Sequence, residues 1–133
     1  YDMKNETRRA IQDFDAAIEA SPTYSMAYYN RGIAHSDLGL LDQAIADFTS
    51  TLKIDPTDTD ALDARGFAYA DLRQFHAALD DLNAAIELDP GFAAAIFHRG
   101  IVYGKMGQFD LGIADYRKAL SMGCLRQGWC PAR

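Results

Sequence analysis

The chain has 133 residues, a formal net charge of −6 and a sequence pI near 4.8. Apolar residues make up 49% of it and charged residues 24%, a composition typical of a folded domain rather than a disordered chain. The acidic balance disfavours nucleic acid as a partner, because a phosphate backbone would be repelled. The longest unbroken apolar run, residues 92–97, is too short to cross a bilayer. We therefore expect neither nucleic-acid binding nor membrane insertion.

Apolar residues recur at helical spacing in segments that follow one another along the whole chain. One kind of break falls at Leu38-Gly39, and another at Pro56 with the aspartates around it, which end one helix and cap the next. The pattern predicts seven helices, over residues 3–20, 25–38, 42–54, 59–72, 76–88, 93–106 and 110–122. From residue 25 onward they pair into hairpins of a first helix A and a second helix B.

A repeat of 34 residues organises these helices. The dipeptides Arg31-Gly32, Arg65-Gly66 and Arg99-Gly100 are spaced by 34 residues, and the flanking residues repeat with them. Full repeats therefore cover residues 25–58, 59–92 and 93–126. Residues 1–24 match the second half of the same unit, a partial repeat with helix B only, and residues 127–133 remain as a C-terminal tail.

The repeat resembles the tetratricopeptide repeat, a 34-residue unit with a bulky residue, a glycine and a tyrosine in helix A, and an alanine, an aromatic residue and a proline later. His35 stands where the tyrosine is expected, Gly112 where the alanine is, and Cys124 where the proline is. The matching residues, by position in the unit, are Tyr28, Leu62 and Ile96; Gly32, Gly66 and Gly100; Tyr69 and Tyr103; Ala10, Ala44 and Ala78; Phe14, Phe48, Leu82 and Tyr116; and Pro22, Pro56 and Pro90.

The resemblance implies an all-α fold, a right-handed superhelical solenoid of antiparallel helical hairpins with about seven helices. It also implies a non-enzymatic scaffold for protein–protein interaction. A glycine in mid-helix costs about 1 kcal/mol relative to alanine. We therefore expect Gly32, Gly66 and Gly100 to allow close backbone approach between helices A and B.

Charged residues repeat in two sets of equivalent positions. The arginines are Arg31, Arg65 and Arg99; the aspartates, sixteen residues later in the unit, are Asp13, Asp47, Asp81 and Asp115. We predict a structural ladder of partly buried, bidentate Arg–Asp pairs between helix A and a neighbouring helix B. The alternative is solvated surface charge worth about 0–1 kcal/mol per residue.

The sequence predicts no enzymatic activity, since it holds no H-E-x-x-H motif, phosphate-binding glycine loop or G-x-S-x-G. His35 is interpreted as a packing residue and His76 as an exposed one. Metal binding by Cys124 and Cys130 would need two more ligands, and no histidine is near them in sequence. We expect no metal and no cofactor.

The resemblance further implies that helix A side chains line an inner groove that holds partner segments. A carboxylate clamp would need asparagine at the ninth place of the unit, which here holds Ile33, Phe67 and Ile101. Such a clamp is therefore not expected. Carried over position by position, the groove comprises Met26, Tyr29, Asn30, Ile33, Asp37, Asp63, Phe67, Asp71, Phe97, His98, Ile101 and Lys105.

These positions form an apolar and aromatic stripe with aspartates near the first two repeats. We predict that the groove binds an extended or helical protein segment with apolar anchors and a basic residue near Asp63 and Asp71. The alternative for Ile33, Phe67 and Ile101 is packing against neighbouring helices. Two other functions stay open: a self-associating module that forms homo-oligomers through open solenoid ends, and an adaptor fragment of a larger protein.

The C-terminal tail carries its own prediction. The outer face of the last helix, including Ile113 and Leu120, would be open, and Trp129 is placed to fold back over it. A Cys124–Cys130 disulfide would pin that arrangement and contribute about 2–3 kcal/mol. It would also indicate an oxidising compartment, periplasmic or secreted. The alternative is two free thiols in a frayed tail.

Overall fold

The structure is a computed structural model that describes residues 3–122. Within that range the chain forms seven α-helices and no strand, which confirms the predicted fold class. No helix there combines the length and the apolar character that a membrane crossing needs. The helices are α1 (Met3–Ala20), α2 (Ser25–Asp37), α3 (Leu41–Ile54), α4 (Thr59–Asp71), α5 (Phe75–Leu88), α6 (Ala93–Lys105) and α7 (Phe109–Ser121). Each begins and ends within one residue of its predicted position.

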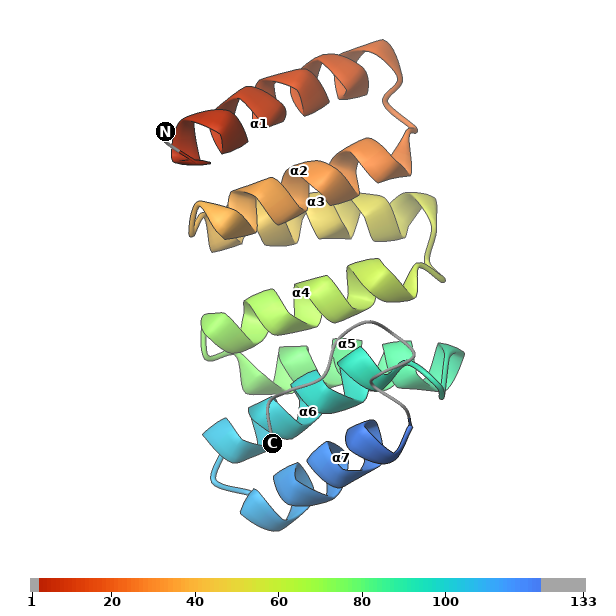
Figure 1. The fold of residues 1–133 in the computed structure, drawn as a ribbon. Helices are drawn as coiled ribbons and strands as arrows, with labels where there is room; N and C mark the ends of the chain where they lie inside the picture. The colour runs from red at the N-terminus through yellow and green to blue at the C-terminus, as the bar shows by residue number, and fades with distance from the viewer. Residues whose placement is uncertain (1–2, 123–133) are drawn as a thin grey trace.

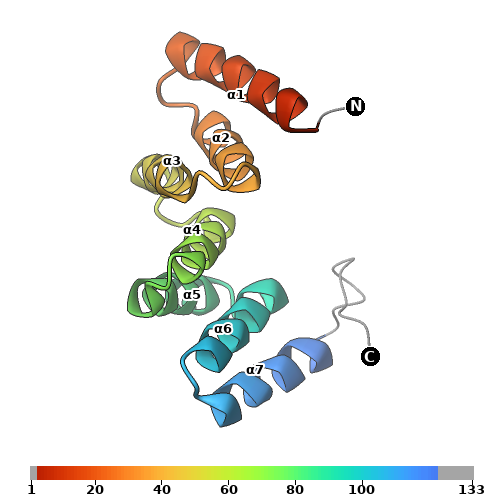
Figure 2. The same ribbon diagram turned by 90° about the vertical axis from the view of Figure 1, so that its left-hand side faces the viewer.

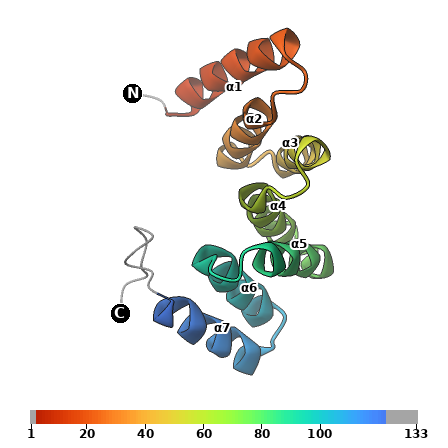
Figure 3. The same cartoon turned by 90° about the vertical axis from the view of Figure 1, so that its right-hand side faces the viewer.

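The helices stack in chain order into a curved solenoid (Figure 1). α2 packs on α3, α4 on α5 and α6 on α7 as the A and B helices of three hairpins, and each hairpin packs on the next. α1, a helix B, packs on α2. Two views at right angles place α3 and α5 on the outer side of the curve and α2, α4 and α6 nearer its inner side (Figures 2 and 3).

Each hairpin turns through one residue in the left-handed region, two residues after the last residue of helix A. These residues are Gly39 (φ 76°), Arg73 (φ 62°) and Gly107 (φ 84°). The next residue closes the turn by donating its N–H back to helix A, as Leu40 does to the His35 carbonyl at 2.8 Å. This geometry satisfies carbonyl groups that the end of a helix otherwise leaves unpaired.

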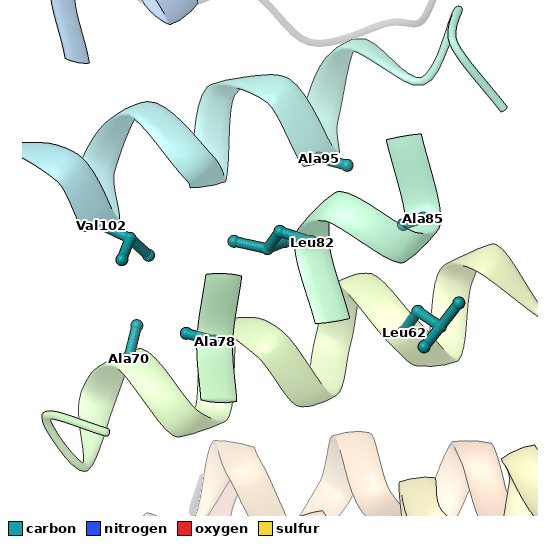
Figure 4. Close-up of a cluster of buried hydrophobic side chains, with 7 residues drawn as sticks. All are labelled: Leu62, Ala70, Ala78, Leu82, Ala85, Ala95 and Val102. Carbon is teal, nitrogen blue, oxygen red and sulfur yellow. The ribbon is translucent and has the colours of Figure 1, made fainter. Parts of the chain in front are cut away.

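The core consists of small apolar residues with a few larger ones between them. Its central cluster joins α4, α5 and α6, and Figure 4 shows Leu82 between the alanines of the neighbouring helices. Leu82 is completely buried, as is its equivalent Phe48 one repeat earlier. Alanine brings helix axes close together, so that one large residue per helix B fills the remaining space. The cluster comprises Leu62, Ala70, Ala78, Leu82, Ala85, Ala95 and Val102.

The mid-helix glycines lie where helices A and B approach most closely, as predicted. A Cβ on Gly32 would fall 2.6 Å from the ring of Phe48, and one on Gly66 would fall 3.0 Å from Leu82. At the third hairpin, a Cβ on Gly100 would lie 3.0 Å from the carbonyl oxygen of Gly112. Gly112, which departs from the alanine of the repeat, thus faces another glycine across the hairpin.

Candidate functional site

Each full repeat contains a bidentate ion pair between its own two helices. The arginine of helix A donates from Nε and Nη2 to the two carboxylate oxygens of an aspartate on helix B, so that both charges are oriented. The aspartates are buried, with exposed fractions of 3%, 5% and 6% along the chain. The pairs are Arg31–Asp47 (3.0 and 2.6 Å), Arg65–Asp81 (2.7 and 2.7 Å) and Arg99–Asp115 (2.8 and 2.8 Å).

The same arginines also reach the preceding repeat, a contact that the sequence analysis did not anticipate. The remaining terminal nitrogen, Nη1, donates to an oxygen on the previous helix B. The acceptors are Asp15 for Arg31 (2.8 Å), Thr49 for Arg65 (3.1 Å) and Asn83 for Arg99 (3.0 Å). Each arginine therefore joins three helices, and we call this arrangement the arginine bridge.

The arginine bridge fixes charge inside the solenoid. Hydrogen bonding to Asp47 raises the pKa of Arg31, outweighing the opposite effect of burial. Hydrogen bonds to Asp81 and Asp115 likewise raise the pKa of Arg65 and Arg99. These arginines therefore stay protonated, and their charge remains opposite the buried aspartates.

His35 does more than pack against its neighbours. His35, at the tyrosine position, is half-buried and lies with Nδ1 2.7 Å from an oxygen of Asp47, so it extends the first arginine bridge. His76 is exposed, as predicted. Within residues 3–122 no three His, Cys, Asp or Glu side chains gather as a metal site would require.

Asp13 does not join the ladder, so this part of the prediction was wrong. It holds the position equivalent to Asp47, but it is exposed on α1 and pairs with no arginine among the described residues. The reason is that α1 has no helix A of its own in the described range, and the bidentate partner comes from helix A in every other repeat. Arg31 instead reaches Asp15 on the same helix.

A cavity of about 360 Å³ opens among α2, α4 and α6 on the inner side of the solenoid, and we call it the inner groove. Its walls combine apolar, aromatic and acidic side chains. Seven of the twelve predicted groove residues line it: Tyr29, Ile33, Asp37, Asp63, Phe67, Asp71 and His98. Of the apolar ones, Ile33 is the most open, with 37% of its surface exposed.

The other five predicted residues lie around this cavity rather than in its walls. Met26 is 52% exposed in the first turn of α2, and Asn30 lines a neighbouring cavity between α1 and α2 that shares Ile33 and Asp37 with the inner groove. The ring of Phe97 packs toward α7, with its centroid 5.4 Å from that of Tyr116. Ile101 is half-buried, and Lys105 is exposed at the end of α6.

Two acidic residues of the groove already have partners in the next repeat. Asp63 lies 2.8 Å from Nδ1 of His98, whose ring packs against Phe67 with centroids 4.7 Å apart. Asp71 lies 3.9 Å from Nζ of Lys105. These contacts link α4 to α6 along the inner side and reduce the negative charge that Asp63 and Asp71 offer to a ligand.

Negative charge remains concentrated near the start of α4. Burial, and after it the charges of Asp60, Asp58 and Asp63, raise the pKa of the Tyr29 hydroxyl to about 12. Burial, and after it the charges of Asp58, Asp63 and Asp89, raise the pKa of Asp60 above its ordinary value. At the other end of the groove, Asp37 is exposed and makes no salt bridge within residues 3–122. Negative charge therefore lies both near the start of α4 and at Asp37 in the groove wall.

Some predicted features lie outside the described residues. Cys124, Cys130 and Trp129 all follow Met122, where the description ends. The open face predicted for α7 is within range, and it is exposed: Ile113 at 47% and Leu120 at 45%.

Models of a known family match most of the sequence. Models of the tetratricopeptide repeat match residues 25–58, 59–92 and 93–122. The chain belongs to the tetratricopeptide repeat family, and its repeats form a scaffold of the kind that mediates protein–protein interaction. A comparison with curated proteins gives no match.

Solved structures of tetratricopeptide proteins share the fold. A crystal structure of MamA aligns with a TM-score of 0.80 and 28% identity, over 92% of this chain and 75% of that one. MamA from Desulfovibrio magneticus RS-1 aligns at 0.82 with 20% identity, over 89% and 67%. The first such domain of Spaghetti (RPAP3), bound to the HSP90 peptide SRMEEVD, aligns at 0.72 with 24% identity, over 74% and 79%.

Proposed function

We propose that the chain binds a segment of a partner protein in the inner groove, through apolar and aromatic contacts and a basic side chain. The observation that carries this proposal is the cavity of about 360 Å³ itself, which opens onto three successive A helices. Its apolar walls hold Tyr29, Ile33 and Phe67, the kinds of side chain that anchor bound peptides. A buried packing role alone does not account for Ile33, since more than a third of it is exposed.

The acidic side chains of the groove indicate where a ligand should carry a basic side chain. Asp63 and Asp71 are engaged by His98 and Lys105, so they are weaker sites for an incoming cation than the sequence suggested. Asp37 is better placed, because it lines the groove and makes no salt bridge in the described chain. We therefore expect a lysine or arginine of the ligand near the Asp37 carboxylate.

The ninth place of each repeat disfavours recognition of a terminal carboxylate. Ile33 and Phe67 line the groove at that place, and Ile101 follows in the third repeat. None of them can donate a hydrogen bond to a carboxylate. A ligand bound here is better matched by an internal segment of a protein than by its C-terminus.

Selection from a phage-displayed random peptide library on the immobilised protein tests this proposal. Enriched peptides should combine apolar residues with Lys or Arg, and Ile33→Asp should weaken them more than tenfold, as loss of a central anchor does. Leu111→Asp is the matched control, since Leu111 is 50% exposed on α7, outside the groove. Enrichment of acidic peptides, or an equal loss for both variants, would contradict the proposal.

A second candidate function is self-association through α7. Phe109 is 66% exposed, whereas its equivalent Phe75 packs against the core, and Ile113 is 47% exposed, whereas its equivalent Leu79 packs there too. An apolar face of this kind is a common site of contact between subunits. Sedimentation velocity of the wild type and of Ile113→Glu distinguishes the two candidate functions. A concentration-dependent oligomer that forms in the wild type and not in the variant favours self-association.

A further inference from the structure

His98 uses one ring nitrogen between two helices and leaves the other at the wall of the inner groove. Nδ1 lies 2.8 Å from a carboxylate oxygen of Asp63, and the side chain of His98 lines the groove with 24% of its surface exposed. Nε2 makes no hydrogen bond with residues 3–122, and no buried side-chain nitrogen or oxygen in that range lacks a partner. Nε2 is therefore the ring nitrogen that a bound segment can reach.

Asp63 determines which hydrogen-bonding role is left for Nε2. An ionised carboxylate only accepts hydrogen bonds, so Nδ1 must carry the proton that joins the two side chains. A neutral imidazole has a single N–H, and its second nitrogen is then an acceptor. Neutral His98 thus presents the lone pair of Nε2 to the groove. Asp63, whose side chain is only 13% exposed, acts as the positioning residue that holds this tautomer.

The surroundings of this acceptor are aromatic. The centroid of the His98 ring lies 4.7 Å from that of Phe67 and 6.0 Å from that of Phe97. A lysine or arginine carries several N–H donors, and most of them would face carbon rings that offer no lone pair. A tyrosine or tryptophan carries a single donor on a flat apolar body that packs well against other rings. Its chemistry therefore matches one acceptor set beside phenylalanine.

We propose that His98 determines specificity in the inner groove, with Nε2 accepting a hydrogen bond from a tyrosine or tryptophan side chain of the bound segment. This inference rests on the proposed function and adds a second feature to its ligand. The contact is specific to the step from α4 to α6, because the equivalents of Asp63 and His98 one repeat earlier are Tyr29 and Ala64. The basic residue expected at Asp37 on α2 and the aromatic donor at His98 thus contact different helices.

Nitrogen NMR of the full chain without any peptide tests the tautomer. Long-range correlation of ring protons with ring nitrogens, at mildly alkaline pH, shows which nitrogen of His98 carries the proton. We expect the proton on Nδ1 and none on Nε2, with exposed His76 as the internal reference. Asp63→Asn should move part of the population to the other tautomer, because an amide can also donate to Nδ1. A proton on Nε2 of the wild type, alone or together with one on Nδ1, would overturn the assignment.

Peptides enriched by the phage selection test recognition itself. They should hold tyrosine or tryptophan at a constant distance from the basic residue. Exchanging tyrosine for phenylalanine, or tryptophan for its N-methylated form, removes only the donor and should weaken binding about tenfold. His98→Phe should bind the two members of each peptide pair within about twofold of each other, because the acceptor is gone. Leu111→Asp, outside the groove, should keep the tenfold preference.

Three further results would each overturn the role of His98. They are enriched peptides without tyrosine or tryptophan, equal binding of both members of a pair by the wild type, and a preference that survives in His98→Phe. The wild-type comparison needs no protein variant, so it holds even where His98→Phe fails to fold. Each of these results leaves the proposed function standing as long as Ile33→Asp still weakens the same peptides. Binding that ignores Ile33→Asp would overturn the groove itself.

Discussion

Asp13 and Asp47 hold equivalent positions in successive repeats, but they differ in burial and in the residues that surround them. Asp47 is 3% exposed and receives hydrogen bonds from both Arg31 and His35, whereas Asp13 is exposed on α1. The residue type was set by the repeat in both cases, but burial was set by whether a helix A lies alongside. Two equivalent residues, one inside a solenoid and one on a helix without that neighbour, can therefore differ by several kcal/mol in their contribution to the free energy of unfolding.

The same contrast applies to function. In the interior, three A helices form the walls of the inner groove. Contacts between repeats, such as Asp63–His98, already engage some of its acidic side chains. At the other end of the described chain, α1 and α2 line a cavity whose one aspartate, Asp37, makes no salt bridge within residues 3–122. Substitutions at covered positions should therefore cost more stability than substitutions at exposed ones.

Arg65→Ala should destabilise the protein by about 3–5 kcal/mol, because it leaves the buried carboxylate of Asp81 without its partner. The double variant Arg65→Met, Asp81→Leu should recover most of that loss, since neither charge is then buried. Urea unfolding followed by circular dichroism measures both. A melt in which Arg65→Ala matches the wild type would show that the arginine bridge is solvated surface charge after all.

Gly32→Ala should cost about 1–3 kcal/mol, although alanine is the better helix former. The added Cβ would lie 2.6 Å from the ring of Phe48, which is completely buried and has little room to move. Gly104→Ala is the control, because no atom lies within 4 Å of a Cβ there, and it should stabilise by a few tenths of a kcal/mol. Equal effects at the two glycines, seen in thermal melts, would contradict close helix approach at Gly32.

Tyr29 should make stability fall at alkaline pH. Its pKa is raised from 10.0 to about 12 in the folded protein, so the unfolded state loses its proton first as pH rises. The contribution is complete below pH 10.0 and is lost on approach to pH 12. After allowance for solvent screening we expect about 1 kcal/mol more loss for the wild type than for Tyr29→Phe. Parallel pH profiles of unfolding free energy for the two proteins would argue against an acidic, half-buried setting for Tyr29.

Asp13→Asn should change stability by less than about 0.5 kcal/mol, the ordinary effect of a surface substitution. Asp81→Asn, at the equivalent interior position, should cost about 2 kcal/mol or more, because it leaves the partly buried charge of Arg65 without its carboxylate partner. Differential scanning calorimetry of the two variants tests the comparison at one position of the repeat. Similar losses for both would mean that neighbours matter less than residue type.

The fold could be predicted because its signals are local and repeat. Helical spacing, the prolines and the mid-helix glycines lie close together in sequence, and the 34-residue period placed the Arg–Asp pairs without any knowledge of distance. The contacts from the arginines to the previous repeat escaped notice because Asp15, Thr49 and Asn83 share only an acceptor oxygen, not a residue type. A search for equivalent positions that keep an acceptor would have found them.

The candidate site was harder to predict than the fold. The Asp63–His98 contact leaves no periodic signal, because the equivalent residues one repeat earlier are Tyr29 and Ala64, which cannot form such a pair. Phe97 occupies the same place in its repeat as Tyr29, and whether either lines a cavity depends on how the next helices curve, which a sequence period does not encode. Asp13 failed for a related reason, since its pairing required a helix that the described chain does not supply.

The most direct test of the central claim is an NMR titration of the full chain with one peptide enriched by selection on the protein. The inner groove predicts shift changes concentrated at Ile33, Phe67 and Asp71, with Ile33→Asp removing them and Leu111→Asp leaving them unchanged. Shift changes confined to the outer residues of α3 and α5, with no response at Ile33 or Phe67, would contradict the assignment of the groove as the binding site.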